Sequence, residues 1–417
     1  MVIEKTKNKL NFLFIKKDIP TVTILVLVRG GTEYENKENN GISHFLEHLC
    51  FKGTKNFPSY QELLSEFDKI GIDYNAFTSY QYIGYYAKSS FENFPKVVFL
   101  VSDILINPIF PESEIEKEKG VVIEEINLYK DTPARYIQDL FLKALYGDQP
   151  AGWLISGSEK NIKKIKRKDI LKFYSKIYTA PNILVVVAGD IKNKSIDLVL
   201  EKFSKVRQGE RSLKSVFKEP KLPNFIIHKK QTNQIHVGVG FLGFPLNDSR
   251  FEKLEILANL IGGMMSSRMF EKIREKMGAA YYIRTENEGF SDHGFIATFA
   301  GLKNELFLEA LNEILNVYKE TKVKISDEEL ERAISNFIGR FYLSLETSDD
   351  LARFYGLSKF LKGKIEEPTQ IIKRIKKIKK QDLINLAREV FRKERLSLSL
   401  IGQVESKTIR KLIENFD

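Results

Sequence analysis

Short apolar runs and longer amphipathic segments divide this chain into predicted strands and helices. The runs VTILVLV (22–28) and ILVVVA (183–188) predict buried strands, because a membrane-spanning helix needs roughly 20 apolar residues. Segments such as SYQELLSEFDKIG and SDEELERAISNFIGRFYLSLE carry apolar residues at helical spacing and predict amphipathic helices. Strands and helices do not alternate regularly, so the pattern predicts an α+β fold rather than a doubly wound parallel sheet.

The same pattern occurs twice at a constant offset. The residues that repeat 213 positions later (375 − 162) are Ile162, Ile165, Asp169 and Gly189, with counterparts Ile375, Ile378, Asp382 and Gly402. The alternating run TVTILVLVRG falls at the same offset on QIHVGVGFLG. We therefore expect two homologous domains, each a mostly antiparallel β-sheet packed with α-helices.

The boundary between the two copies is expected in a stretch with little periodicity. Residues 204–224, SKVRQGERSLKSVFKEPKLPN, are basic and contain two prolines. The sequence predicts a first domain at 1–207, a linker at 208–224 and a second domain at 225–417. The length of 417 residues fits two domains of ordinary size.

Composition narrows the class of protein. The 43% hydrophobic and 29% charged residues are typical of a globular chain. The net charge is +11, and its two lysine-rich clusters (160–169 and 373–382) repeat isoleucine every three residues. This spacing favours solvated faces of amphipathic helices over a nucleic-acid site, whose sign would be salt-dependent binding. We expect neither a nucleic-acid partner nor a membrane.

The N-terminal residues and the single cysteine bear on location. The start MVIEKTKNKLNFLFIKKDIP has no apolar core followed by a small-residue cleavage site, and Cys50 alone forms no disulfide within the chain. Both features favour a cytoplasmic location. Cys50 follows the histidine motif described next, so a reactive thiol is one reading, and a small buried hydrophobe is the favoured one.

The stretch SHFLEHLCFKGT (43–54) is the strongest chemical signal. On a helix, His44, Glu47 and His48 share one face, and two neutral imidazoles on one face suit zinc. The alternative is a solvated helix face that carries histidines by accident. At the offset of 213 the same positions are Leu257, Leu260 and Ile261. A helix of this fold is therefore built without the polar cluster, which favours the functional reading.

A third ligand must come from elsewhere, because catalytic zinc commonly has three protein ligands and one open position. The predicted helix at 113–131 offers four glutamates, Glu116, Glu118, Glu124 and Glu125. Glu118 and Glu125 are two helical turns apart and share a face, whereas Glu124 points elsewhere. Manganese or cobalt would suit the same ligand types.

These motifs give the chain a specific resemblance. It resembles the pitrilysin-type (M16) zinc metallopeptidases, in their short two-domain form similar to mitochondrial processing peptidase and its bacterial relatives. The blocks that carry the likeness, in order, are RGGTEYENKENNGISHFLEHLCFKGT, GIDYNAFTSYQYIGYY, SGSEKNIKKI, YTAPNILVVVAGDI and GGMMSSRMFEKIREKMGAAY. The chain departs from the usual pattern at Met264, Met277 and Ala279.

The resemblance implies roles for particular residues. It assigns His44, His48 and Glu125 to one Zn²⁺ per chain, with 76 residues between His48 and Glu125. It implies that Glu47 is the general base that activates a zinc-bound water, and that Glu118 supports the site from behind the ligands.

The resemblance also implies where a peptide binds. Asn75, Ala76 and Phe77 would lie beside the zinc and receive the substrate as an added strand, although core packing alone would also explain this aromatic stretch. Arg274 and Tyr281 would reach the active site from the second domain; the alternative is a surface arginine and a packed tyrosine. The long family members form a chamber from four domains, so this two-domain chain is expected to form a homodimeric clamshell.

The sequence therefore predicts a zinc metalloendopeptidase that hydrolyses unfolded peptides or short protein segments inside a dimeric chamber. One alternative is a catalytically silent or partner-dependent peptide-binding subunit of a heteromeric peptidase. Another is a peptide-binding module with structural zinc, which would favour four closed ligands.

Overall fold

The computed structural model of the chain describes residues 1–416, which fold into two compact units. Unit 1 contains Met1–Asn127, Trp153–Val216 and Ser344–Ile365, and unit 2 contains Leu128–Gly152, Phe217–Leu343 and the residues from Glu366 onward. Each unit therefore receives a segment from outside the contiguous halves that the sequence predicts. The boundaries at 207 and 225 stay a prediction about the repeat.

Unit 1 is built on a six-stranded mixed sheet in the order β1-β2-β6-β3-β5-β4. Its strands are β1 (Val2–Lys7), β2 (Leu10–Lys16), β3 (Thr21–Arg29), β4 (Asp73–Thr78), β5 (Tyr82–Ser90) and β6 (Ile183–Gly189). Only β2 and β6 pair in parallel among the described strands of this sheet. Its helices are α1 (Ile42–Leu49), α2 (Tyr60–Asp68), α3 (Phe94–Ile106), α4 (Glu112–Asp131), α6 (Glu159–Lys164), α7 (Arg167–Ile177), α8 (Asn193–Phe203) and α12 (Ser348–Leu357). Strand β4 forms one edge of the sheet.

Unit 2 repeats this plan with a five-stranded sheet in the order β7-β11-β8-β10-β9. Its strands are β7 (Asn224–His228), β8 (Gln234–Leu242), β9 (Ala280–Gly289), β10 (Gly294–Lys303) and β11 (Leu396–Ile401). Its helices are α5 (Pro133–Tyr146), α9 (Phe251–Ala258), α10 (Phe307–Thr321), α11 (Asp327–Leu343), α13 (Pro368–Ile375), α14 (Lys380–Val390) and α15 (Ser406–Glu414), with π-helical turns η4 (Asn259–Gly263) and η5 (Phe270–Lys276). Its parallel pair, β7 and β11, matches β2 and β6.

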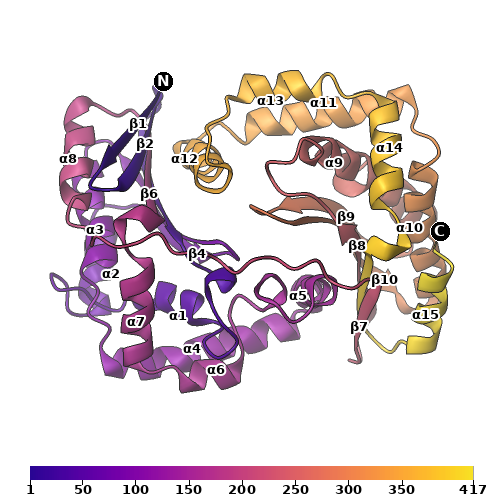
Figure 1. Cartoon of the computed structure of the whole chain (residues 1–417), viewed down its shortest axis with the longest axis horizontal. Coiled ribbons are helices and arrows are strands. Elements are labelled where there is room, and N and C mark those ends of the chain that lie inside the picture. Colours follow the sequence, from indigo (N-terminus) through magenta and orange to yellow (C-terminus); the bar gives the residue numbers. More distant parts are fainter. Residues whose placement is uncertain (417) are drawn as a thin grey trace. The chain divides into compact units, whose positions relative to one another are not determined.

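Helix α12, from the C-terminal part of the chain, packs on the sheet of unit 1, and α5, from the N-terminal part, packs on the sheet of unit 2 (Figure 1). In unit 1, α12 brings Gly356 close to Leu25 and Leu27 of β3. The alternate residues of β3 belong to the main core on the other face. A strand covered on both faces is apolar throughout, which explains the run VTILVLV. In unit 2, Phe141 of α5 lies where a side chain at Gly238 or Gly240 would be.

The shared strand order confirms the predicted α+β class with two related units. The repeated residues have the same structural roles in both units. Gly189 and Gly402 end β6 and follow β11 with positive φ angles of 131° and 153°, which favour glycine. Asp169 and Asp382 accept hydrogen bonds from the backbone N–H of Lys166 and Lys379, at 3.0 and 3.1 Å, where α7 and α14 begin.

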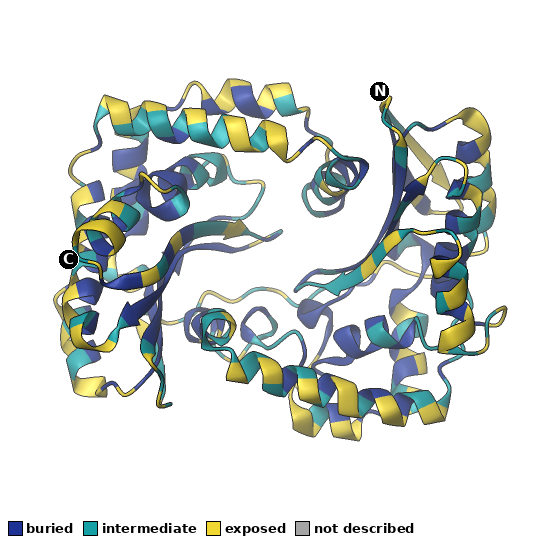
Figure 2. Cartoon of the chain, turned by 180° about the vertical axis from the view of Figure 1, so that it is seen from behind, coloured by how far each residue is buried: buried dark blue, intermediate teal, exposed yellow. Residues whose placement is uncertain are grey.

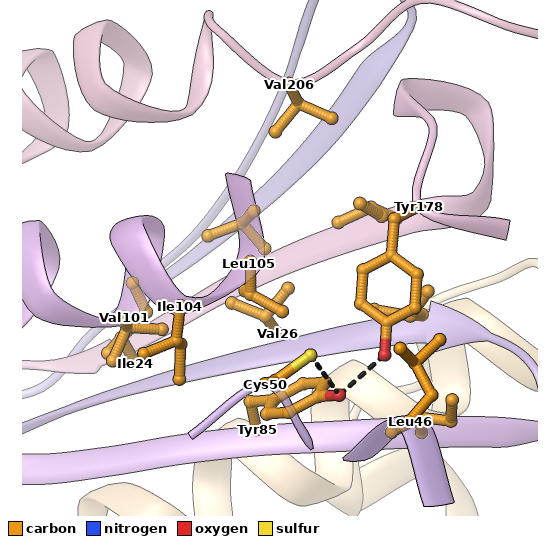
Figure 3. Close-up of a cluster of buried hydrophobic side chains, with 14 of the residues drawn as sticks. Ile24, Val26, Leu46, Cys50, Tyr85, Val101, Ile104, Leu105, Tyr178 and Val206 are labelled. Carbon is orange, nitrogen blue, oxygen red and sulfur yellow. Dashed lines mark hydrogen bonds between the residues drawn. The ribbon is translucent and has the colours of Figure 1, made fainter. Parts of the chain in front are cut away.

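The core of unit 1 lies between its sheet and helices α1, α3, α7 and α8. In Figure 2 the central strands are buried, whereas the helices have a buried side and an exposed side. Cys50 lies in this core beside Val26 and Leu105, and its Sγ accepts a hydrogen bond from Tyr85 at 3.5 Å (Figure 3). Burial raises the pKa of the Cys50 thiol to about 12, so it stays protonated. No helix within residues 1–416 is long and apolar enough to cross a membrane.

Candidate metal centre

The N-terminal end of α1 is fixed by a buried carboxylate. Glu35 is 5% exposed, and its two oxygens accept hydrogen bonds from the backbone N–H groups of Gly41 and Ser43 at 2.9 and 2.8 Å. Gly41 has a φ of 100°, and a Cβ there would lie 2.8 Å from the carbonyl oxygen of Ser156. Burial raises the pKa of Glu35, against its hydrogen bonds with Ser43, Gly41 and Asn40, which lower it. These contacts set the position of the helix that carries the histidine motif.

Three predicted ligand atoms converge at this helix. The Nε2 atoms of His44 and His48 lie 3.3 Å apart, and Oε2 of Glu125, on α4, lies 3.6 Å from each of them. These are also the residues of unit 1 whose ligand atoms all fall within 4.8 Å of one another. Two nitrogen atoms from α1 and one oxygen atom from α4 thus form a triangle of donors.

The triangle fits a tetrahedral zinc ion. Zinc bonds of about 2.0–2.2 Å to nitrogen and oxygen place tetrahedral ligand atoms about 3.3–3.6 Å apart. The separations of 3.3, 3.6 and 3.6 Å fall within that range. Three protein ligands leave the fourth tetrahedral position open, as in catalytic zinc sites. The donor set and its spacing therefore suit a catalytic rather than a closed structural ion.

Glu118 orients one of the two histidines. Its Oε1 lies 2.8 Å from Nδ1 of His48, and the residue is 3% exposed. A carboxylate acceptor selects the tautomer with hydrogen on Nδ1, which leaves the Nε2 lone pair directed at the triangle. Burial alone would raise the pKa of Glu118, yet hydrogen bonds from His48 and Lys52 hold it below its usual value. The Nδ1 of His44 is buried and has no hydrogen-bond partner within residues 1–416.

Glu47 lies between the two histidines in sequence and is 8% exposed. Its Oε2 accepts a hydrogen bond of 2.6 Å from the hydroxyl of Thr78, at the end of β4. Burial raises the pKa of Glu47 to about 7, against the Thr78 hydrogen bond and the charge of His48, which lower it. A carboxyl with a pKa near neutrality is suited to accept and return a proton.

The two histidines differ in basicity because their surroundings differ. Burial, and then the charge of His48, lower the pKa of His44 to about 4. Burial would also lower the pKa of His48, but the hydrogen bond to Glu118 and the charges of Glu47, Glu118 and Glu125 raise it instead. The neutral His44 has the form that binds a metal ion.

Strand β4 places the predicted substrate residues on two faces. Ala76 lies on the same face as Thr78, toward α1, whereas Asn75 and Phe77 lie on the opposite face. Arg353 of α12 lies over the Phe77 ring, 5.5 Å from its centre. Oδ1 of Asn75 accepts a hydrogen bond from the backbone N–H of Ala76. As an edge strand, β4 has one side without a neighbouring strand in its sheet.

The other predicted residues lie apart from the triangle or in unit 2. Glu116 and Glu124 are exposed on α4, and Glu116 pairs with Lys119 at 2.7 Å. Arg274 and Tyr281 belong to unit 2, at η5 and the start of β9, and both are exposed, Tyr281 by 56%. Their roles stay predictions.

Sequence reasoning missed three residues that support the site. Glu35 anchors the start of α1, Thr78 holds Glu47, and Lys52 pairs with Glu118 at 2.7 Å. Lys52 and Thr78 stand inside the quoted blocks SHFLEHLCFKGT and GIDYNAFTSYQYIGYY, so closeness to the motif was a usable signal. Their partners, however, are 31 residues or more away along the chain.

The two-unit α+β fold and its donor triangle are those of a zinc-protease-like protein, and comparisons with known proteins agree. The profile described as "Insulinase (Peptidase family M16)" matches residues 12–158, and the one described as "Peptidase M16 inactive domain" matches residues 164–337. An "Uncharacterized zinc protease" of Rickettsia felis is 34% identical over 93% of this chain and 94% of its own length. The chain belongs to peptidase family M16.

Further relatives extend this picture. The "Uncharacterized zinc protease YmxG" of Bacillus subtilis is 33% identical over 92% of this chain and 93% of its own length. A crystal structure of a protease from Helicobacter pylori has a TM-score of 0.90 at 25% identity, covering 96% of this chain and 99% of that one. A "peptidase M16 inactive domain" from Pseudomonas fluorescens shares the fold, with a TM-score of 0.88, 15% identity, and coverage of 97% and 98%.

Proposed function

We propose that this protein is a zinc-dependent endopeptidase that hydrolyses unfolded peptides or short protein segments. The observation that carries the proposal is the donor triangle of His44, His48 and Glu125, in which the two histidines lie on α1, the helix that also presents Glu47, and Glu125 lies on α4. Relatives named zinc proteases over nearly the whole chain support the same chemistry.

One zinc ion per chain would be held by the two Nε2 atoms and the Glu125 carboxylate. When bound, zinc lowers the pKa of water and polarises a carbonyl group. The protein contributes the orientation of its ligands, because Glu118 fixes the tautomer of His48 through Nδ1 at 2.8 Å. Burial of His44 and Glu118 keeps bulk water from competing for these contacts.

Glu47 is the proposed general base. Its carboxylate accepts a proton from the attacking water and passes it to the nitrogen of the departing amine. Thr78 donates its hydroxyl hydrogen to Oε2 of Glu47 and so leaves Oε1 as the oxygen for proton transfer. Because Thr78 ends β4, this contact links the base to the strand proposed to hold the substrate.

The substrate is proposed to bind along β4 in an extended form. An edge strand offers backbone N–H and C=O groups to a peptide, and such pairing tolerates many side chains. Only unfolded segments expose a continuous backbone for it. If replacing Asn75 with Ala leaves kcat/KM on an unstructured peptide unchanged, Asn75 is not part of the site.

Arg274 and Tyr281 are proposed to act across a homodimer on the zinc site of the partner. Their exposure leaves both side chains accessible to another surface. Mixing a Glu47→Gln chain with an Arg274→Ala chain tests this arrangement, since each supplies what the other lacks. Recovered hydrolysis supports sharing, and no recovery in verified mixed dimers contradicts it.

The function itself is tested by hydrolysis of a quenched, unstructured peptide library. We expect cleavage by the wild-type protein, loss with a chelator, return with zinc, and loss in Glu47→Gln with zinc still bound. A protein that binds one zinc per chain but cuts no peptide under any condition would instead support the silent, partner-dependent subunit.

A further inference from the structure

A chain of two polar contacts extends from the metal centre to Lys52. His48 contributes Nδ1 to Oε1 of Glu118 at 2.8 Å, and the other oxygen of Glu118 lies 2.7 Å from Nζ of Lys52. The side chains of Glu118 and Lys52 are 4% and 17% exposed. Both oxygens of a buried carboxylate are thus occupied, one by the candidate ligand and one by a cation.

Lys52 is itself held in place. Its ammonium lies 4.4 Å from the centre of the Tyr60 ring, at the start of α2. The loop after it is anchored by Thr54, whose hydroxyl donates to the buried Asp103 carboxylate at 2.5 Å. Gly53 has a φ of 131°, and a Cβ there would lie 2.6 Å from the Pro58 carbonyl oxygen. The backbone around Lys52 is therefore built for one conformation.

We propose that Lys52 is a positioning residue of the metal centre, which holds Glu118 so that Glu118 in turn fixes His48 as a zinc ligand. This inference rests on the proposed function. It assigns Lys52 to the support of one ligand and gives it no contact with substrate.

The physical reason lies in the burial of Glu118. A buried carboxylate needs partners for both oxygens, and with one partner missing it reorients or loses its charge. Lys52 supplies the second partner, so the first oxygen stays on Nδ1 of His48. An exposed surface ion pair would contribute little, but this pair is largely shielded from water.

The direction of the effect on zinc affinity separates positioning from simple charge. Lys52 is a cation close to a dication site, so its repulsion alone disfavours zinc, and removing it would strengthen binding. If Lys52 acts by positioning, removing it weakens binding instead. Losing such a supporting contact commonly costs about tenfold or more in metal affinity.

The test measures zinc dissociation constants of the full chain by competition with a chromogenic chelator. The variants are Lys52→Met, which removes the ammonium, Lys52→Arg, which keeps a cationic donor, and Lys117→Met as a matched control. Lys117 is 71% exposed on the same helix as Glu118 and pairs with Glu114. The melting temperature and circular dichroism of each metal-free variant show whether it is folded.

We expect zinc binding to weaken about tenfold in Lys52→Met, as for other supporting contacts, and to stay close to wild type in Lys52→Arg and Lys117→Met. In a Glu118→Gln background, Lys52→Met is expected to add little, because Lys52 acts through Glu118. Unchanged or tighter binding in Lys52→Met, or an equal further loss in the Glu118→Gln background, overturns the inference.

The proposed function and this inference fail in different ways. A wild-type chain that binds no zinc overturns both. A wild-type chain that binds zinc and cleaves peptides, together with a Lys52→Met chain of equal zinc affinity, overturns only the role of Lys52. If Lys52→Met does not fold, Lys52→Gln, which keeps a neutral donor, is compared with Lys52→Arg; equal zinc affinity in these two contradicts the need for a cation.

Discussion

The two repeats place very different residues at equivalent positions of the same fold. In unit 1, helix α1 carries His44, Glu47 and His48; in unit 2, the segment formed by α9 and η4 carries Leu257, Leu260 and Ile261 there. All three apolar residues are at most 1% exposed. The fold forms with either apolar residues or a polar cluster at this helix. Folding therefore does not require the polar cluster.

The facing helices differ in the same way. On α4, Glu118 is buried and Glu125 contributes to the donor triangle; on α11 the equivalent residues are Glu331, which is exposed, and Ile338. The glutamate at this position of α4 is therefore buried against His48 and Lys52, whereas the glutamate at the equivalent position of α11 is exposed. The difference teaches that the site is a cooperative set, since each buried charge depends on its partner.

The largest effect is expected when the polar set is replaced by its apolar counterpart. In the chain with His44→Leu, Glu47→Leu and His48→Ile, we expect loss of zinc binding and of all peptide hydrolysis. The metal-free chain should still fold, because the equivalent helix of unit 2 is built with buried apolar residues at these positions. Its melting temperature should fall below that of the wild type, because the buried Glu118 loses His48 as a hydrogen-bond partner. Zinc titration, peptide hydrolysis and thermal unfolding measure these three outcomes.

Two results would go against this first comparison. A chain that fails to fold would mean that the polar cluster is needed for the structure of α1. Retained hydrolysis would mean that the reaction takes place elsewhere. Glu47→Gln serves as the matched control, because it alters the base while leaving the donor triangle of His44, His48 and Glu125 intact.

The reverse exchange is expected to damage stability rather than activity. Leu257→His, Leu260→Glu and Ile261→His would bury three polar groups, each at a cost of about 2 kcal/mol or more without matched partners. We expect the free energy of unfolding of unit 2 to fall by several kcal/mol. Urea unfolding measures this change. No loss would show that the second repeat retains room for a polar site.

Much of this comparison could be predicted from the sequence. The constant offset predicted two related units, and Asp169 and Asp382 illustrate why: each caps its own helix through local contacts three residues apart. Two spacings were also predictable: His44 and His48 lie one turn apart on α1, and Glu118 and Glu125 lie two turns apart on α4. Both follow from the geometry of a helix, which local sequence determines.

Other features depend on contacts that local sequence does not encode. The exchange of α5 and α12 between the units requires knowing which sheet face each helix covers, and either sheet offers an apolar one. Thr78 and Lys52 look like ordinary strand and loop residues until Glu47 and Glu118 are placed beside them. Tertiary pairing of distant segments is what sequence periodicity leaves open.

A smaller effect on stability is expected when the acidic residue that precedes α1 or α9 is replaced. Glu35 in the first repeat corresponds to Asp248 in the second, whose side chain accepts a hydrogen bond from the backbone N–H of Arg250 at 2.8 Å. Glu35→Ala would leave the buried N–H groups of Gly41 and Ser43 unpaired, at a cost of about 3 kcal/mol, whereas Asp248→Ala should cost about 1 kcal/mol.

Urea unfolding of the two variants measures this difference, and zinc titration adds a second readout. We expect Glu35→Ala alone to weaken zinc binding, because it loosens the start of the helix that carries His44. Equal losses of stability, or unchanged zinc affinity in Glu35→Ala, would show that the anchor does not distinguish the repeats.

The smallest effect is a pH dependence confined to one repeat. Glu329 at the start of α11 pairs with Arg268 through two contacts of 2.6 and 2.9 Å, whereas its counterpart Glu116 is 69% exposed and pairs with Lys119. Burial alone would raise the pKa of Glu329, but the hydrogen bonds from Arg268 and Ser326 lower it to about 2. A carboxyl with a lowered pKa in the folded state stabilises the fold while it is ionised.

The stabilisation from Glu329 is therefore complete above its ordinary pKa of 4.5 and is lost as the pH falls toward about 2. After allowance for solvent screening it amounts to about 1 kcal/mol. We expect Glu329→Gln to be less stable than wild type at pH 7, with a gap that narrows between pH 5 and pH 3, measured by urea unfolding. Glu116→Gln should match wild type throughout, because a solvated ion pair contributes little. A parallel pH dependence in both variants would mean that the half-buried contact between Arg268 and Glu329 is not its source.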